Sequence, residues 1–408
     1  MANNVANVDA VTDAMGGVAL AEPTTPLAPS WLPALRGAGE QSSRAVRSHL
    51  KRLPDVLPHS AVIPVEEPLV QTDTAPGFSA LRRVAVGNGP IADMTIDAAS
   101  GRMFVTNHAD DSVSVLDAST LSVRATITDL YDPFAVTIAD GHAYVSTASF
   151  HCDAVTMVAP GAADPITHPM ADSVRDIVAN PDGKHIYVAR TGRDGADMAA
   201  IDTTDGRVTT VELGTRHGAT AEAITVSRDG SRVFLATVDH LGGEVVAIDT
   251  DARRVVSGLA FDTSVRDLAV SADGGVLFVA GDDAAVGGIV DVVDTASMRV
   301  LGTVELGNAA TQLTLSASGE RLYIVNGDRV AVMCTRTYEV IDTVTAVGEP
   351  SCVTESADGK WLYIADFDGG ITILTVASST ESLLAQMMSD DDAVIDVPML
   401  ELERADRV

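Results

Sequence analysis

The sequence predicts an all-β protein, a seven-bladed β-propeller built of four-stranded antiparallel blades, and three observations lead to this prediction. A turn that ends in glycine recurs seven times, at spacings of 40 to 47 residues. A short run rich in β-branched and aromatic residues follows each turn. A strand pattern without partners precedes the first repeat, whereas the last repeat lacks its fourth strand. A fixed period of this length indicates stacked, similar units.

The recurring turns identify the blades. Most of the glycines follow aspartate, and Asp-Gly tolerates the positive φ that tight hairpin turns require. The seven glycines are Gly101, Gly141, Gly183, Gly230, Gly274, Gly319 and Gly359.

Each turn leads into a strand that we expect to be the second of its blade. One further short strand precedes each turn, and in most repeats two more follow the run. Four short strands per repeat without helical periodicity are typical of a propeller blade. The seven runs are Met103–Asn107, Ala143–Thr147, Ile186–Arg190, Val233–Thr237, Leu277–Gly281, Leu322–Asn326 and Leu362–Asp366.

These runs resemble the YVTN signature of the YVTN-repeat (YncE-like) β-propeller family, across about three quarters of the chain. Only the first and sixth runs end in Asn. The resemblance implies a seven-bladed ring, and members of this family often occur outside the cytoplasm.

The two ends of the array predict how the ring closes. The last repeat ends with Gly370–Val376, its third strand, whereas Leu81–Val86 forms an extra strand before the first repeat. We therefore expect the N-terminal strand to complete the last blade, which removes the open edges of the array.

The predicted propeller covers residues 78–376. The arm 1–77 is rich in Pro, Ala, Ser and Thr and is predicted to be largely disordered. Within it, Ser42–Leu53 has the pattern of a short basic helix, which could touch a partner, touch an acidic face of the propeller, or form only transiently. The segment 377–408 is predicted to be an acidic tail with a short helix.

The formal net charge of −30 argues against nucleic-acid and anionic-membrane partners. No stretch approaches the roughly 18 uninterrupted apolar residues of a membrane span. The N-terminal residues contain no apolar segment behind a basic stretch. We therefore expect no conventional secretory signal. We expect a cytoplasmic monomer, with association with the cell envelope as the alternative. The three cysteines do not form a disulfide framework.

Register alignment of the repeats predicts the candidate site at one end of the central channel, where loops of several blades converge. The alignment places these residues just before the innermost strands: Asp93, Ala135, Asp176, Ala223, Asp267, Gln312 and Cys352. The preceding residues are Ala92, Phe134, Arg175, Glu222, Arg266, Thr311 and Ser351.

Two readings of this charged set are open. Asp93, Asp176, Glu222 and Asp267 could hold a divalent cation such as calcium through oxygen ligands. Alternatively, the carboxylates could form ion pairs with Arg175 and Arg266 and so order the channel mouth.

Histidines are predicted on the same face. His108, His151, His217 and His240 come from different loops, and histidine beside carboxylates could perform acid–base chemistry near neutral pH. Nothing in the sequence places any two of them within hydrogen-bonding reach.

The function predicted from these features is a non-enzymatic scaffold that binds a protein, a peptide or a small ligand on its charged loop face. The chain has no nucleophile elbow and no phosphate-binding loop. The alternative is a hydrolase resembling the seven-bladed lactonases, which would use mouth carboxylates and a divalent metal to activate water.

Overall fold

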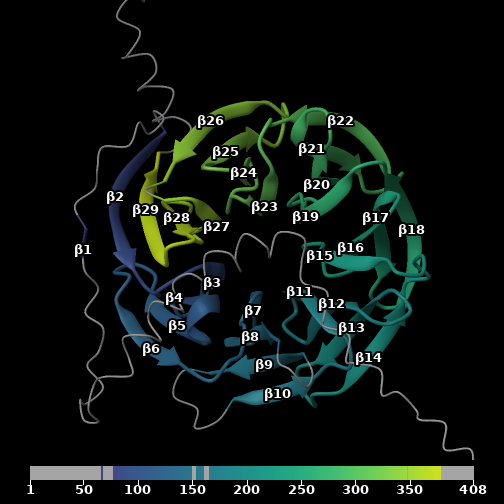
Figure 1. The fold of residues 1–408 in the computed structure, drawn as a ribbon, viewed down its shortest axis with the longest axis horizontal. Helices are drawn as coiled ribbons and strands as arrows, with labels where there is room; N and C mark the ends of the chain where they lie inside the picture. The colour runs from purple at the N-terminus through teal and green to yellow at the C-terminus, as the bar shows by residue number, and fades with distance from the viewer. Residues whose placement is uncertain (1–65, 68–76, 149–152, 160–164, 347, 378–408) are drawn as a thin grey trace, which may run out of the picture.

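The computed structural model describes residues 66–67, 77–148, 153–159, 165–346 and 348–377. Their strands form seven antiparallel sheets, arranged as blades around a central axis (Figure 1). The predicted all-β, seven-bladed fold is confirmed. Within the described residues the helical structure is one short 3₁₀ turn, η2 (His108–Asp110), and no helix is long and apolar enough to cross a lipid bilayer.

The first four blades follow the chain, each from its innermost to its outermost strand. Blade 1 is β3 (Ile91–Asp97), β4 (Arg102–Asn107), β5 (Ser112–Asp117) and β6 (Val123–Ile127). Blade 2 is β7 (Val136–Ala139), β8 (His142–Thr147), β9 (Ala154–Val158) and β10 (Ile166–Pro169). Blade 3 is β11 (Ser173–Ala179), β12 (His185–Thr191), β13 (Ala196–Asp202) and β14 (Val208–Glu212). Blade 4 is β15 (Thr220–Val226), β16 (Arg232–Asp239), β17 (Gly242–Asp249) and β18 (Arg254–Phe261).

The last three blades complete the ring. Blade 5 is β19 (Ser264–Val270), β20 (Val276–Asp283), β21 (Gly287–Asp294) and β22 (Arg299–Glu305). Blade 6 is β23 (Ala310–Leu315), β24 (Arg321–Asn326), β25 (Arg329–Cys334) and β26 (Val340–Thr345). Blade 7 contains β27 (Pro350–Glu355), β28 (Trp361–Asp366) and β29 (Gly370–Val376), followed by β2 (Phe78–Ala85) and β1 (Glu66–Glu67).

The N-terminal strand lies where the sequence predicts it. β2 pairs antiparallel with β29, with Phe78 opposite Val376 and Ala85 opposite Gly370. Arg83 reinforces this pairing, because its guanidinium contacts Asp366 Oδ2 from Nη2 at 2.8 Å and from Nε at 2.9 Å. The Asp366 side chain is only 1 % exposed. A charge buried so fully needs its partner.

The backbone of the recurring turns explains the sevenfold glycine pattern. All seven glycines adopt positive φ, between 66° and 74°. A residue with a Cβ atom adopts this conformation only at a cost in free energy, whereas glycine does so freely.

The apolar core is divided among the interfaces between blades. Seven clusters of buried side chains lie between successive blades, and one of them joins blade 7 to blade 1. Tyr323 and Phe104 are among the largest buried side chains. Each blade therefore depends on both neighbours for burial of its apolar faces.

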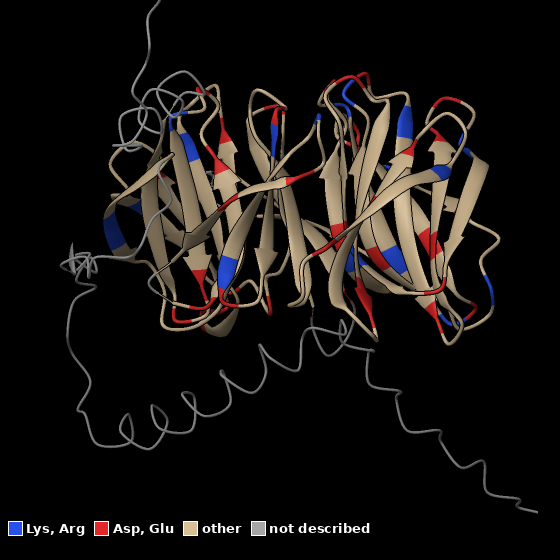
Figure 2. Ribbon diagram, turned by 90° about the horizontal axis from the view of Figure 1, so that it is seen from above, with Lys and Arg blue, Asp and Glu red and all other residues tan. Residues whose placement is uncertain are grey.

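The loops gather along two rims of the disc, which Figure 2 shows edge-on. Because successive strands are antiparallel, the connections between them alternate between the two rims. We call the segments that join the first to the second and the third to the fourth strand of a blade the turn rim. The mouth rim consists of the segments that join the second to the third strand, together with those that join successive blades.

The predicted flanking segments fall almost wholly outside the described residues. Of the predicted arm 1–77, the structure describes Glu66–Glu67 and Gly77, and Glu66–Glu67 adds a short fifth strand to blade 7. Of the predicted tail 377–408, it describes only Ala377.

The Arg83–Asp366 pair should be essential for ring closure. We expect Arg83→Met to lower the free energy of unfolding by about 3 kcal/mol, because it leaves a buried carboxylate without its counter-charge. The matched control is Arg207→Met, because the Arg207–Asp205 pair is exposed and should contribute at most about 1 kcal/mol. Urea unfolding monitored by tryptophan fluorescence measures both. Equal losses in the two variants would contradict a special role for the buried pair.

Candidate functional site

The innermost strands begin earlier than the sequence predicts. Asp176, Asp267 and Gln312 lie inside β11, β19 and β23 rather than before them. A register shift occurs near the start of the innermost strand in every blade except blade 2. Such a bulge breaks the alternation of side chains, so the sequence pattern becomes recognisable only after it.

The mouth carboxylates hold neighbouring blades together. Oδ2 of Asp93 accepts the backbone N–H of Val136 in blade 2 at 2.9 Å. In the same way, Asp176 accepts the N–H of Ile224 in blade 4 at 2.9 Å.

Two further blades repeat this arrangement. Asp267 accepts the N–H of Leu313 at 2.6 Å, and Oε1 of Gln312 accepts the N–H of Val353 at 2.7 Å. We call Asp93, Asp176, Asp267 and Gln312 the clasp residues. The Oδ1 atom of each clasp aspartate accepts the N–H of the next residue in its own strand. Each of these carboxylates therefore joins two blades.

The clasp carboxyls titrate far from their ordinary range. Burial raises the pKa of Asp93 to about 7 and that of Asp176 to about 6. Burial, together with the negative charges of Asp176 and Asp93, raises the pKa of Asp267 to about 8. Each side chain keeps some exposed surface, yet protein surrounds it closely enough to disfavour the ionised form. The three carboxyls therefore influence one another electrostatically.

The two arginines of the Arg-Asp sequence pairs have different surroundings. Nε of Arg266 donates to Asp282 Oδ2 at 2.8 Å. Asp282 lies opposite Ser264 in the β19–β20 pairing, and the equivalent position in blade 3, opposite Ser173, is Thr191. Blade 3 therefore lacks the carboxylate that Arg266 uses in blade 5.

Arg175 is buried without the hydrogen bonds that its guanidinium can make. The residue is 4 % exposed, and its Nε and Nη1 atoms have no hydrogen-bond partner in the described chain. Burial lowers the pKa of Arg175, while the charges of Glu222 and Asp153 partly offset this effect. Burial also raises the pKa of Glu222, although Arg175 opposes this shift. Arg175 is thus enclosed among blades 2, 3 and 4.

The predicted histidines do not join this set through any hydrogen bond in the described part of the chain. His108 begins η2 in blade 1, and its Nδ1 atom is buried without a partner there. His217 and His240 are exposed on the mouth rim, and His151 lies outside the described residues. Their acid–base role stays a prediction.

The metal hypothesis finds no preformed cluster among the described residues. No group of three or more His, Cys, Asp or Glu side chains there could hold a metal ion. Asp93, Asp176 and Asp267 direct both oxygens to backbone N–H groups. A calcium site built from these residues and Glu222 therefore stays a prediction.

Sequence reasoning placed the loop that ends at Asp153 on this face but did not identify the contact of Asp153 or the significance of Thr191. Asp153 joins blade 2 to blade 3, because its Oδ2 atom accepts the N–H of Val174 at 2.9 Å. It lies in a loop outside the register of the innermost strands, so no repeat signal marks it. A comparison of the two Arg-Asp repeats alone could have shown that blade 3 has Thr191 where blade 5 has Asp282.

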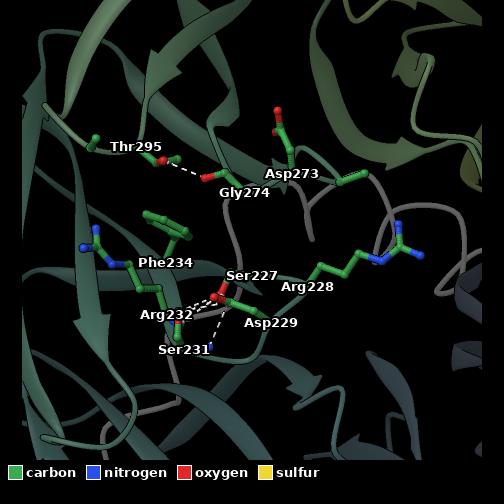
Figure 3. Close-up of a pocket in the computed structure, with 11 residues that line it drawn as sticks. Ser227, Arg228, Asp229, Ser231, Arg232, Phe234, Asp273, Gly274 and Thr295 are labelled. Atoms are coloured by element: carbon green, nitrogen blue, oxygen red, sulfur yellow. Dashed lines mark hydrogen bonds between the residues drawn. The ribbon is translucent and has the colours of Figure 1, made fainter.

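A cavity of about 580 Å³ opens on the opposite side, at the turn rim between blades 4 and 5 (Figure 3). Phe234, Arg232 and Thr295 contribute to its lining, and the Arg228 side chain extends away from them in Figure 3. Its Asp229 accepts hydrogen bonds from Ser227 and Ser231. That carboxylate thus stabilises the turn itself, and none of the predicted site residues lines the cavity.

The raised pKa values predict an unusual dependence of stability on pH. From about pH 4 to about pH 8 the folded protein holds protons on the clasp carboxyls that the unfolded chain releases. The free energy of unfolding should therefore fall as pH rises through this window. Asp267→Asn should reduce the slope, because it removes the carboxyl with the highest of these three pKa values. Urea unfolding at several pH values measures this slope.

Gln312→Ala is the control for that experiment. It removes a clasp that does not titrate, so it should cost about 1 kcal/mol and leave the slope unchanged. A stability that rises steadily from pH 5 to pH 8 in the wild-type protein would contradict the raised pKa values.

Solved structures support the fold assignment. The chain is similar to a chain of hydrazine synthase from Kuenenia stuttgartiensis, with a TM-score of 0.63 and 22% identity, covering 77% of this chain and 99% of that one. It is also similar to the β-propeller domain of Cps50 (Swd1) from Myceliophteria thermophila, with a TM-score of 0.60 and 12% identity, covering 74% and 100%. At these identities the similarity shows the fold alone.

A curated relative shows the family, although no family model matches the chain. The seven-bladed β-propeller protein Rv1057 of Mycobacterium tuberculosis is 37% identical over 350 residues, covering 77% of this chain and 88% of the relative. Together with the seven blades described above, this similarity shows that the chain belongs to the family of seven-bladed β-propeller proteins that includes Rv1057.

Proposed function

We propose that the protein is a non-enzymatic binding scaffold whose ligand or partner docks at the channel mouth and interacts with Arg175. The fold supplies a rigid ring, and its mouth rim brings loops from all seven blades together. Binding sites of proteins commonly lie where loops converge on such a scaffold.

The observation that carries this proposal is the state of Arg175. Leaving a buried donor without an acceptor costs about 1–3 kcal/mol, and more for a charged group. Buried polar groups in folded proteins nearly always have a partner, either protein, water or ligand. Nε and Nη1 of Arg175 lack one in the described chain. A carbonyl, carboxylate or phosphate oxygen supplied by a ligand would complete the site.

The lactonase-like alternative has less support. Groups with a pKa near neutrality are well suited to acid–base catalysis, and the clasp aspartates have such values. Their oxygens, however, accept backbone N–H groups of two blades. A carboxyl that holds the ring together is poorly placed to activate water.

The finer family assignment and the cellular location are also proposals. The seven runs after the glycine turns support placement in the YVTN-repeat (YncE-like) group. The cytoplasmic location is a prediction from the sequence, and fractionation of the native host tests it.

Arg175→Met should separate binding from stability. Because the substitution removes a buried, unsatisfied charge, we expect the ligand-free protein to be as stable as wild type or more stable. The matched control is Arg190→Met, since Arg190 is equally buried but contacts Asp197 at 2.7 and 2.8 Å. This control should lose about 3 kcal/mol. Urea unfolding provides the comparison, and equal losses would show that Arg175 has a structural role.

A second variant keeps Arg175 but gives its guanidinium an acceptor within the protein, so that it no longer binds a ligand. Thr191→Asp places a carboxylate where blade 5 has Asp282, so it should pair with Arg175 and stabilise the protein. Thermal shift against a panel of carboxylates, phosphates and short peptides should identify compounds that stabilise the wild type. These compounds should have no effect on Thr191→Asp or Arg175→Met. Compounds that stabilise all three proteins equally would overturn the proposed site.

A further inference from the structure

The two rims of the disc differ in charge. Among the described residues, the mouth-rim segments contain eleven Asp or Glu residues and two arginines, Arg193 and Arg216. The turn-rim segments contain nine acidic residues and six Lys or Arg residues. Arg216 is also paired with Asp239 at 3.0 Å. The negative charge of the loops is therefore concentrated on one side of the ring, and such a surface attracts cationic partners.

The carboxylates of the two rims have different tasks. On the turn rim, Asp229, Asp273 and Asp358 accept hydrogen bonds from serines within their own turns. These bonds lower the pKa of each, that of Asp229 to about 2.

Several mouth-rim carboxylates have no comparable role in the described structure. Asp132, Glu349 and Asp368 are exposed. No hydrogen bond or ion pair to another described residue involves their carboxylate oxygens. Their charge therefore does not stabilise a turn and is free to attract a partner.

Exposed apolar side chains are also found on the mouth rim. Tyr131 is 60% exposed, Leu241 61% and Val286 37%, and all three lie in mouth-rim loops. The other large exposed apolar residues of the described chain lie on strands. An aromatic ring among carboxylates can bind a cation through its face, and exposed apolar anchors are typical of polypeptide-binding surfaces.

Arg175 restricts the chemistry of the occupant. A polyamine or metal ion would be attracted by the rim but brings no acceptor for Nε and Nη1 of Arg175. A phosphate backbone brings acceptors but is repelled by the rim. A basic polypeptide brings both, because its side chains are cationic and its backbone carbonyls accept hydrogen bonds.

The chain itself contains such a polypeptide. Residues 36–52 contain five of the chain's 27 Lys and Arg residues and a single acidic residue, Glu40. Residues 1–35, by contrast, contain no Lys or Arg. This basic segment lies outside the described residues.

The attachment point is at the mouth side of the disc. β2 runs toward the mouth rim, and β1 pairs with it antiparallel, with Glu66 opposite Val84 and Glu67 opposite Arg83. β1 lies outside β2 in blade 7 (Figure 1). The chain before Glu66 therefore starts near the mouth rim.

The distance to be covered is short for the intervening chain. Fourteen peptide links separate Arg52 from Glu66, and an extended chain of that length spans up to about 50 Å. A compact domain of about 300 residues has a radius of gyration near 19 Å. The connection is therefore long enough for the basic segment to reach the mouth rim around the channel axis.

We infer that residues 36–52 dock on the acidic mouth rim of their own propeller. The inference rests on the proposed function, because it uses the same mouth surface and Arg175, and it adds an occupant from the same chain. Attraction between unlike charges would supply the binding, and the short connection raises the effective concentration of the segment.

The lysines of the chain allow a sharp test on the full-length protein. There are only three, Lys51 in the basic segment and Lys184 and Lys360 on the turn rim. A carbodiimide joins a lysine amine directly to a nearby carboxylate, and mass spectrometry identifies the joined peptides. We expect Lys51 to be joined to mouth-rim peptides such as those of Asp132, Glu349 and Asp368, and Lys184 and Lys360 to turn-rim peptides.

Three matched changes test the cause. Mouth-rim cross-links should fall at least fivefold in 1 M NaCl, where the Debye length is about 3 Å. They should also fall in Arg44→Gln/Arg47→Gln/Arg52→Gln, which keeps Lys51. Asp132→Asn/Glu349→Gln/Asp368→Asn should likewise lower the yield of cross-links from Lys51 to the other mouth-rim carboxylates, which this variant keeps.

The control carries the same change of charge on the other rim. Asp140→Asn/Asp251→Asn/Glu339→Gln should leave the cross-links of Lys51 at wild-type yield. Cross-links of Lys51 mainly to turn-rim peptides would overturn the inference. The experiment is repeated on an equal mixture of isotope-labelled and unlabelled protein. If Lys51 is joined only to peptides of the other chain, the segment docks on a second copy, which would also overturn the inference.

The two sets of experiments distinguish a failure of this inference from a failure of the proposed function. Loss of ligand response in Arg175→Met with no cross-link from Lys51 would support the scaffold and reject the docked arm. The reverse result would support the docked arm and reject Arg175 as a ligand site.

Discussion

The ring depends on hydrogen bonds that cross from one blade to the next at the channel mouth. Antiparallel pairing holds each blade together, and apolar clusters fill the spaces between blades. The clasp residues add direct links between the innermost strands at four of the seven junctions, because each accepts an N–H of the following blade. The bulge beside each clasp frees the side chain from the regular alternation of the strand.

This use of carboxylates explains why the mouth has features of both a structural and a functional site. A carboxyl whose pKa lies near neutrality would, on its pKa alone, be a candidate for acid–base catalysis. Here the same burial that raises the pKa of Asp93 and Asp267 accompanies two backbone hydrogen bonds to each. Arg175 differs, because it is buried without equivalent partners in the described chain. Its burial is the observation on which the proposed ligand site rests.

The sequence was sufficient to predict the blades and their closure, because both depend on local signals. Glycines such as Gly183 and Gly359 have positive φ at the same point of each repeat. The extra strand before Gly87 completes blade 7, whose own repeat supplies three strands. The roles of the mouth residues were less accessible. Asp176 accepts an N–H from Ile224, 48 positions further along the chain, and no local pattern specifies that contact.

The contrast between Arg175 and Arg266 shows the same limit. Both precede aspartate at the same register position, and the sequence treats them alike. Their difference depends on the residue facing the start of the innermost strand, Thr191 in one blade and Asp282 in the other. The pairing of strands shows that this residue faces the arginine's strand, and an alignment of the two repeats alone would have shown that it differs between them.

Native-state hydrogen exchange tests the central claim about the clasps most directly. The amides of Val136, Ile224 and Leu313 belong to the innermost strands and donate to clasp carboxylates of the preceding blades. The account predicts that they exchange only through large-scale unfolding, as slowly as amides of the central strands. It also predicts that Asp176→Ala accelerates exchange at Ile224 far more than at Leu313. Fast exchange of all three amides in the wild-type protein would contradict the account.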